Sequence, residues 1–200
     1  MISASVKSIG KHAFRCCRSL QSVVIPESVT SIGRGAFERC GSLQSVVIPG
    51  SVTSIGDDAF ADCTSLQYVV IPESVKSIRR EAFSRCSSLE SVVMPGSVAS
   101  IERNAFEDCG ALKTIKLTGI LNPDSFKGIH NALPKSLETL DLSGCFIADM
   151  ETIKRILDYS LITANLRNII FPALKLNALE SKEGGETKEE APSSRGLSLM

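Results

Sequence analysis

A phrase of 23 residues repeats along the first half of the chain and constrains its fold more than any other feature. The phrase is clearest over residues 25–47, IPESVTSIGRGAFERCGSLQSVV, and it starts again at Ile48, Ile71 and Met94, with a partial copy before residue 25. The same residue type recurs at equivalent positions, as phenylalanine does at Phe14, Phe37, Phe60, Phe83 and Phe106. A fixed period of this length is typical of solenoids, in which every repeat forms one coil and contacts only its neighbours.

Each repeat contains a short β-branched stretch that predicts a strand. In the second repeat, Val46 and Ile48 alternate with Ser45 and Val47, so we expect the first pair to face the core and the second to face solvent. Pro49 follows at once and suits the end of a strand, because proline donates no hydrogen bond. Strands of successive coils then form a parallel sheet with a step of about 4.8 Å.

The opposite side of each coil is predicted to be helical over a short length. In residues 57–63, Ala59, Phe60 and Cys63 fall on one helical face and the acidic residues on the other. Because such pieces are wider than strands, we expect the stack to curve with the sheet on its inner side.

Glycine follows the inward isoleucine in the early repeats only. Gly10, Gly33 and Gly56 take this position, whereas Arg79 and Glu102 take it later. A strictly left-handed backbone resists such a change, so the turn is expected to prefer glycine there without requiring it.

The pattern IPxSVxSIGxxAFxxCxSLxSVV, over about residues 2–117, resembles the BspA-like leucine-rich repeats of bacterial and protist surface proteins. The resemblance implies a curved, β-rich solenoid and a role in adhesion or ligand binding, often at a cell surface. The expected fold class is therefore an α/β repeat. It is a leucine-rich-repeat solenoid with a parallel β-sheet on the concave side and short helices or 3-10 turns on the convex side.

Three regions are expected along the chain. Residues 1–117 hold the regular repeats, residues 118–180 hold irregular longer repeats and a C-terminal cap, and residues 181–200 form a disordered tail of polar and charged residues. Residues 137–147 fit the general leucine-rich consensus, with Cys145 at its turn position. A helix is predicted over about residues 150–160, a seventh strand over residues 166–172 and capping leucines at 174, 176 and 179, and the strand spacing grows from 23 to 25 and 29 residues.

The chain begins in the middle of a repeat, with Ile2 in the place of Ile25. Either the first coil is frayed or the chain is a piece of a longer protein, and we favour the second interpretation.

The seven cysteines do not have the pattern of a disulfide framework. Their number is odd, and five of them recur at one repeat position, namely Cys17, Cys40, Cys63, Cys86 and Cys109. Zinc sites need close pairs such as CxxC, and the sequence has none. We expect a column of buried free thiols, with reagent access limited to Cys16 and Cys145.

Composition and motifs exclude several classes of function. The formal net charge is zero, with 22 basic and 22 acidic residues, which argues against a dedicated nucleic-acid binder. No apolar run is long enough for a membrane span, and the first 25 residues have no apolar core of a secretory signal. His12 and His130 lie far apart and no phosphate-binding loop is present, so neither an enzyme nor a cofactor nor a metal is predicted. The location stays open between the cell surface, which the resemblance implies, and the cytoplasm.

The outward strand positions on the concave face are the candidate ligand-binding residues. They include a stripe of valines bordered by hydroxyls and end in a charged pair: Ser45, Val47, Tyr68, Val70, Ser91, Val93, Lys116 and Asp141. An exposed apolar stripe marks an interaction site, or it stabilises the strand ladder through neighbouring β-branched side chains. The leading hypothesis is a non-enzymatic module that binds a protein or glycan partner, in cell-surface adhesion. The alternatives are an intracellular scaffold and a structural segment of a larger protein.

The convex face carries charges whose sign changes from repeat to repeat. The helical stretches are basic in the first repeat, acidic in the third and basic again in the fourth. This alternation predicts ion pairs between neighbouring coils, each worth about 0–1 kcal/mol. The face is expected to be solvated, and a charge-patterned partner site is the alternative.

Overall fold

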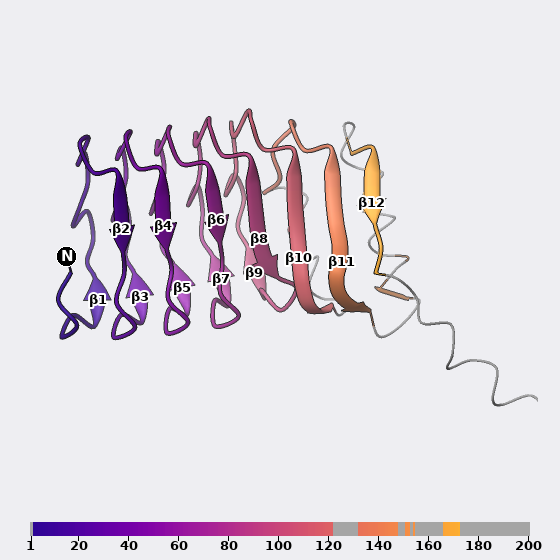
Figure 1. Ribbon diagram of the computed structural model, residues 1–200, viewed down its shortest axis with the longest axis horizontal. Helices are drawn as coiled ribbons and strands as arrows, with labels where there is room; N and C mark the ends of the chain where they lie inside the picture. Colours follow the sequence, from indigo (N-terminus) through magenta and orange to yellow (C-terminus); the bar gives the residue numbers. More distant parts are fainter. Residues whose placement is uncertain (1, 122–131, 148–150, 153, 155–165, 173–200) are drawn as a thin grey trace, which may run out of the picture.

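Each 23-residue repeat forms one coil of a parallel β-solenoid in the computed structural model (Figure 1). The structure describes residues 2–121, 132–147, 151–152, 154 and 166–172. In this part of the chain two parallel sheets run along the stack, and the apolar core lies between them and the turn side.

The predicted strands form the larger sheet. In spatial order its members are β12 (Asn168–Ile170), β11 (Thr139–Ile147), β10 (Thr114–Leu121), β8 (Ser91–Pro95), β6 (Tyr68–Val70), β4 (Ser45–Val47) and β2 (Ser22–Val24). Equivalent repeat positions pair with each other, as Val23 does with Val46. The predicted seventh strand and the growing spacing are confirmed, because Thr139 pairs with Thr114 on one side and with Asn168 on the other.

A second sheet was not predicted. It consists of two-residue strands in the order β1 (Ser8–Ile9), β3 (Ser31–Ile32), β5 (Ser54–Ile55), β7 (Ser77–Ile78) and β9 (Ser100–Ile101). The inward direction of the isoleucines was predicted correctly, and Ile55 is fully buried. Two residues are too few for a periodicity signal, so only the repetition from coil to coil reveals these strands.

Short helices or 3-10 turns were predicted for the opposite side, and the described regular repeats carry successive turns there and no helix. In residues 57–63 the backbone N–H groups alternate between two kinds of acceptor. Those of Ala59 and Cys63 bond three residues back within the coil, whereas those of Phe60 and Asp62 bond carbonyls of the next coil at 2.8 and 2.9 Å. A helix needs every N–H for its own ladder, so the coil-to-coil bonds exclude it. The extra width that would have curved the stack is therefore missing over these repeats.

The left-handed backbone positions lie elsewhere than the repeated glycine. Positive φ occurs two residues before and two residues after each phenylalanine, at His12, Cys16, Gly35, Arg39, Asp58, Asp62, Glu81, Arg85, Asn104 and Asp108. Each is the third residue of a turn that demands positive φ. Gly56 has a different role, because a Cβ there would lie 2.8 Å from the Gly33 carbonyl carbon of the preceding coil. Arg79 occupies the same position in a later coil, and the preference for glycine without a requirement stays a prediction.

Phenylalanine rings form a continuous stack through the core. From Phe14 to Phe106, successive ring centroids lie 5.1–5.4 Å apart and the rings tilt by only 2–5°. The rings of Phe37, Phe60, Phe83 and Phe106 are fully buried. Offset parallel aromatic pairs add to the stabilisation that burial alone gives.

The cysteine column is buried beside the ring stack from the second coil onward. The Cys63 thiol donates to the Phe37 carbonyl at 3.2 Å, and the equivalent bonds recur at Cys40, Cys86 and Cys109. Burial raises the pKa of Cys40 to about 11 and that of Cys109 to about 12. Because the thiolate is the reactive form, these cysteines are protected by protonation as well as by position.

Thiol labelling of the native protein should be confined to Cys16 and Cys17. Both side chains are exposed on the first coil, whereas the other five cysteines are buried. This corrects the expectation from sequence, which placed Cys17 in the core and allowed access to Cys145. Mass spectrometry after a brief pulse of maleimide is the measurement, with all seven cysteines labelled after denaturation. Rapid native labelling of Cys63 or Cys86 would contradict the buried column.

Several predictions lie outside the described residues. They are the capping leucines at 174, 176 and 179, the tail over 181–200, most of the predicted helix over 150–160 and the part of the irregular repeat over 122–131. The boundary at residue 117 stays a prediction. Within the described part of the chain, no helix has both the length and the apolar character that a membrane crossing requires.

Candidate binding surface

The outward side chains of the larger sheet form a surface that we call the strand face. Val24 is 68% exposed and Tyr68 is 49% exposed, which are high values for residues of their size and polarity. The sequence placed eight residues on this surface. Ser45, Val47, Tyr68 and Val70 are exposed, and Ser91, Val93, Lys116 and Asp141 are partly exposed. The sheet brings all eight onto one surface, and their role in binding stays a prediction.

A column of polar residues beside the predicted ones was missed from the sequence. Gln21, Gln44 and Gln67 precede the strands and are exposed. Strict alternation assigns only every second residue to the surface, but two consecutive residues are exposed where each of these strands begins. The signal that could have found them is the recurrence of glutamine at the same repeat position.

Charged residues on the strand face, other than the exposed Glu90, are matched to one another within the molecule. The Lys113 ammonium lies 2.7 Å from the Glu138 carboxylate, and Lys116 lies 3.7 Å from Asp141. The hydrogen bond from Lys113 holds the pKa of Glu138 below its usual value. The pKa of Asp141 is also lowered, mainly by a hydrogen bond from Ser143 and to a smaller extent by Lys116. These exposed pairs add little to stability, but they leave little unmatched charge for a partner.

The remaining part of the strand face, which we call the neutral half, carries no charged outward side chain over its three described strands. It comprises Gln21, Ser22, Val24, Gln44, Ser45, Val47, Gln67, Tyr68 and Val70, on or directly before β2, β4 and β6. The ordered steps of the sheet place the same chemical group at the same height on each coil, with Tyr68 in the column that Ser22 and Ser45 begin.

Polar side chains of the neutral half are free, whereas repeated hydroxyls elsewhere are used. Ser28, Ser51 and Ser74 each donate to a carbonyl of the preceding coil at 2.6 Å. Among the described residues, the amides and hydroxyls of the neutral half make no side-chain hydrogen bond with protein groups. Their donors and acceptors are therefore available to a ligand.

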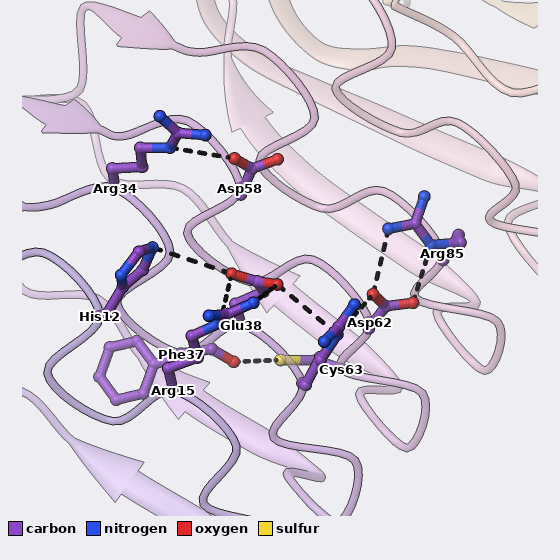
Figure 2. Close-up of polar contacts among 10 residues, drawn as sticks. His12, Arg15, Arg34, Phe37, Glu38, Asp58, Asp62, Cys63 and Arg85 are labelled. Carbon is purple, nitrogen blue, oxygen red and sulfur yellow. Dashed lines mark hydrogen bonds and ion pairs between the residues drawn. The ribbon is translucent and has the colours of Figure 1, made fainter.

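The turn side carries the ion pairs that the alternating charges predicted (Figure 2). Arg15 lies 2.9 Å from Glu38, Arg34 lies 3.4 Å from Asp58, and Arg39 lies 3.8 Å from Asp62. The next coil continues the series, where the guanidinium of Arg85 bonds both carboxylate oxygens of Asp62 at 2.8 and 3.0 Å. This hydrogen bonding lowers the pKa of Asp62.

The paired charges form a ladder between neighbouring coils. Each member is at least partly exposed, so the energy per pair is modest. Because these charges pair with opposite charges of neighbouring coils, the turn side offers a charged partner fewer unmatched charges than the alternation in the sequence indicated.

A hollow of about 460 Å³ lies where the regular repeat ends. Phe106 donates to the Ala132 carbonyl just as Phe83 donates to Ala105, so the two alanines are equivalent. Leu112 follows Ala105 by seven positions, whereas Leu137 follows Ala132 by five. The shorter turn leaves space against the fifth coil. Its polar lining includes Asn104, Glu107, Asp108, Lys135 and Ser136.

The described residues contain no group of three or more histidine, cysteine, aspartate or glutamate side chains that could hold a metal ion. The two carboxylates in the hollow therefore do not define a cation site.

Comparison with known proteins identifies the repeat. The sequence profile described as the BspA type leucine-rich repeat region matches residues 7–133 and 66–182, in six copies. No curated protein matches the chain significantly.

Solved structures of bacterial leucine-rich repeat proteins are similar to the chain. A leucine-rich repeat protein of T. pallidum is 30% identical, with a TM-score of 0.56, over 84% of this chain and 81% of that one. A leucine-rich repeat protein of Bacteroides ovatus is 35% identical, with a TM-score of 0.52, over 73% of this chain. The match spans only 40% of the Bacteroides protein.

The pneumococcal vaccine antigen PcpA shares the fold, with a TM-score of 0.64 at 20% identity, over 86% of this chain and 40% of that one. The coil geometry and the profile match, which covers more than half of the sequence, lead to one conclusion. The chain belongs to the BspA-type leucine-rich repeat family.

Proposed function

We propose that the chain is a non-enzymatic binding module whose strand face docks a protein or glycan partner in adhesion at a cell surface. One observation carries the proposal. The strand face holds exposed valines and free polar groups in regular columns, while the charges of the turn side and the repeated hydroxyls between the two sheets are bonded between coils.

The exposure of the valines favours a docking role over the alternative, in which they only stabilise the ladder of strands. Val24 and Val47 are among the most exposed large apolar side chains of the described residues. Covering such side chains on binding contributes about 25 cal/mol per Å² of apolar area. Extended surfaces of this kind are what solenoid repeats present to partners.

A double substitution on the strand face tests the proposal. The variant Val47→Glu with Tyr68→Glu places two charges at the centre of the face, and we expect it to weaken binding by at least about tenfold, because buried unpaired charge is costly. The measurement is biolayer interferometry of the full chain against arrays of purified proteins and glycans, followed by titration of each ligand that binds.

The matched control carries the same charges on another side of the coils. Thr30→Glu with Thr53→Glu alters two exposed residues before β3 and β5, at a position where Lys76 shows that charge is accepted. Binding lost equally in both variants, or unaffected by the strand-face variant, would contradict the proposal. Absence of any ligand on the arrays would favour a purely structural segment.

A further inference from the structure

We propose that the neutral half of the strand face binds a linear, uncharged polysaccharide in an extended conformation, laid across the strands along the solenoid axis. The inference rests on the proposed function and names the class of partner for that surface.

Charge is the first argument. Over β2, β4 and β6 the described outward side chains are glutamine, serine, tyrosine and valine. The nearest charge on the face is the exposed Glu90, which follows Gln67 in the glutamine column and has no ion pair with another described residue. Beyond it, Lys113 and Lys116 are matched by Glu138 and Asp141. A polyanion or a polycation gains little from such a surface, because electrostatic complementarity needs unmatched charge of the opposite sign. An uncharged partner does not need such complementarity.

Spacing is the second argument. Successive coils step by 5.1–5.4 Å at their stacked rings. This step is close to the length of one pyranose unit in an extended β-linked chain, so each coil meets one sugar. The amides of Gln21, Gln44 and Gln67 then each face one edge of a sugar unit. Successive units of a β-1,4-linked chain present opposite edges, and an amide suits either edge because it both donates and accepts.

Apolar contact is the third argument. A pyranose ring has C–H faces as well as hydroxyl edges. The stripe of Val24, Val47 and Val70 lies beside the polar columns, and the half-exposed ring of Tyr68 stands where neighbouring coils carry serine. Tyrosine combines an apolar ring with a polar hydroxyl, which suits stacking against one sugar and bonding to its neighbour.

Protein partners suit the neutral half less well. Protein interfaces concentrate their energy in a few tryptophan, tyrosine or arginine anchors within packed pockets, and Tyr68 is the one such side chain among the outward residues of β2, β4 and β6. Regular columns of modest groups instead favour a repeating polymer, because weak contacts in series multiply through effective concentration.

Calorimetric titration of the full chain with two neutral series, cello-oligosaccharides and N-acetylated chito-oligosaccharides from disaccharide to hexasaccharide, tests the inference. Affinity in at least one series should rise about tenfold or more between the disaccharide and the tetrasaccharide and then level off, because the neutral half spans few coils. Raising the salt concentration should leave the affinity unchanged, because no charge is neutralised.

Two variants borrow residues that equivalent positions already carry, so their fold is expected to survive. Tyr68→Ser restores the residue type of Ser45 and Ser91, and Gln44→Glu introduces the residue type of Glu90. Each should lower the affinity for the tetrasaccharide by about fivefold to tenfold, a loss of the size expected for one stacking or hydrogen-bonding group. The control Thr53→Glu should bind like the original chain.

The inference is overturned if neither series binds, if affinity is independent of chain length, or if Tyr68→Ser binds unchanged. Salt-sensitive binding to charged glycans alone would also overturn it. One outcome would support the proposed function and reject the polysaccharide. In it, a protein ligand binds the original chain but not the variant Val47→Glu with Tyr68→Glu, and neither sugar series binds.

Discussion

Excising residues 48–70 should leave a folded solenoid that is one coil shorter and less stable by about 1–3 kcal/mol, at roughly 0.05–0.15 kcal/mol per residue. The cut joins Val47 to Ile71, which is the residue equivalent to Ile48, so the repeat continues without a shift. Each coil contacts its neighbours through equivalent positions, and Phe83 can then take the place of Phe60 above Phe37. Urea denaturation followed by circular dichroism measures both the midpoint and the slope, which should fall with the lost surface.

A smaller deletion should be far more damaging. Removing residues 48–59 takes out about half a repeat and places Phe60 directly after Val47, so strand positions would stack on turn positions. We expect this variant to lose its cooperative unfolding transition. A cooperative transition in this variant, or an unfolded product of the full-coil excision, would contradict nearest-neighbour stacking.

The charge ladder allows a further test with the excised protein. In the shortened protein Arg39 would face Arg85, because Asp62, which lies between them and contacts both, is gone. Like charges in contact destabilise by roughly the amount that an exposed pair stabilises, about 0–1 kcal/mol. Adding Arg85→Asp to the excision should therefore recover that amount, whereas the same substitution in the complete chain should destabilise it.

Phe60→Ala should cost about 3–5 kcal/mol of unfolding free energy, the range seen when a buried aromatic side chain is truncated. The Phe60 ring is fully buried between Phe37 and Phe83, each 5.2 Å away between centroids. Truncation removes both ring contacts and opens a void that backbone bonds on two sides keep from collapsing. Chemical denaturation gives the free energy.

Phe14→Ala is the matched control for this prediction. Phe14 belongs to the same repeat position but is only partly buried and has one stacked neighbour, Phe37. Its truncation should cost less than half as much. Equal losses at both positions would show that stacking in the interior does not set the cost.

Packing positions were predicted from sequence because they repeat. The inward Phe, Cys, Ile and Val residues recur every 23 residues, and a side chain that must fit against its own copy above and below leaves few alternatives. The same reasoning placed the outward valines correctly, because alternation along a strand assigns faces without further information.

The turn side could not be predicted in this way. The stretch around Phe60 has an amphipathic spacing that a short helix also satisfies, and the deciding bonds, from Phe60 to Ala82 and from Asp62 to Ser84, join residues about one repeat apart. Local propensity contains no information about such partners. The glutamine column was missed because two consecutive residues are exposed at the start of each of these strands, which breaks strict alternation.

Backbone bonds from coil to coil have a mechanical consequence for the stack. A force applied at the two ends of the stack pulls one coil away from its neighbour, and each coil is held by nearly the same set of bonds. Over the regular repeats the chain should therefore lengthen in equal steps, each releasing 23 residues, or about 80 Å at roughly 3.3–3.6 Å per residue. Such a stack unfolds one coil at a time, while the coils that are still folded keep their part of the strand face.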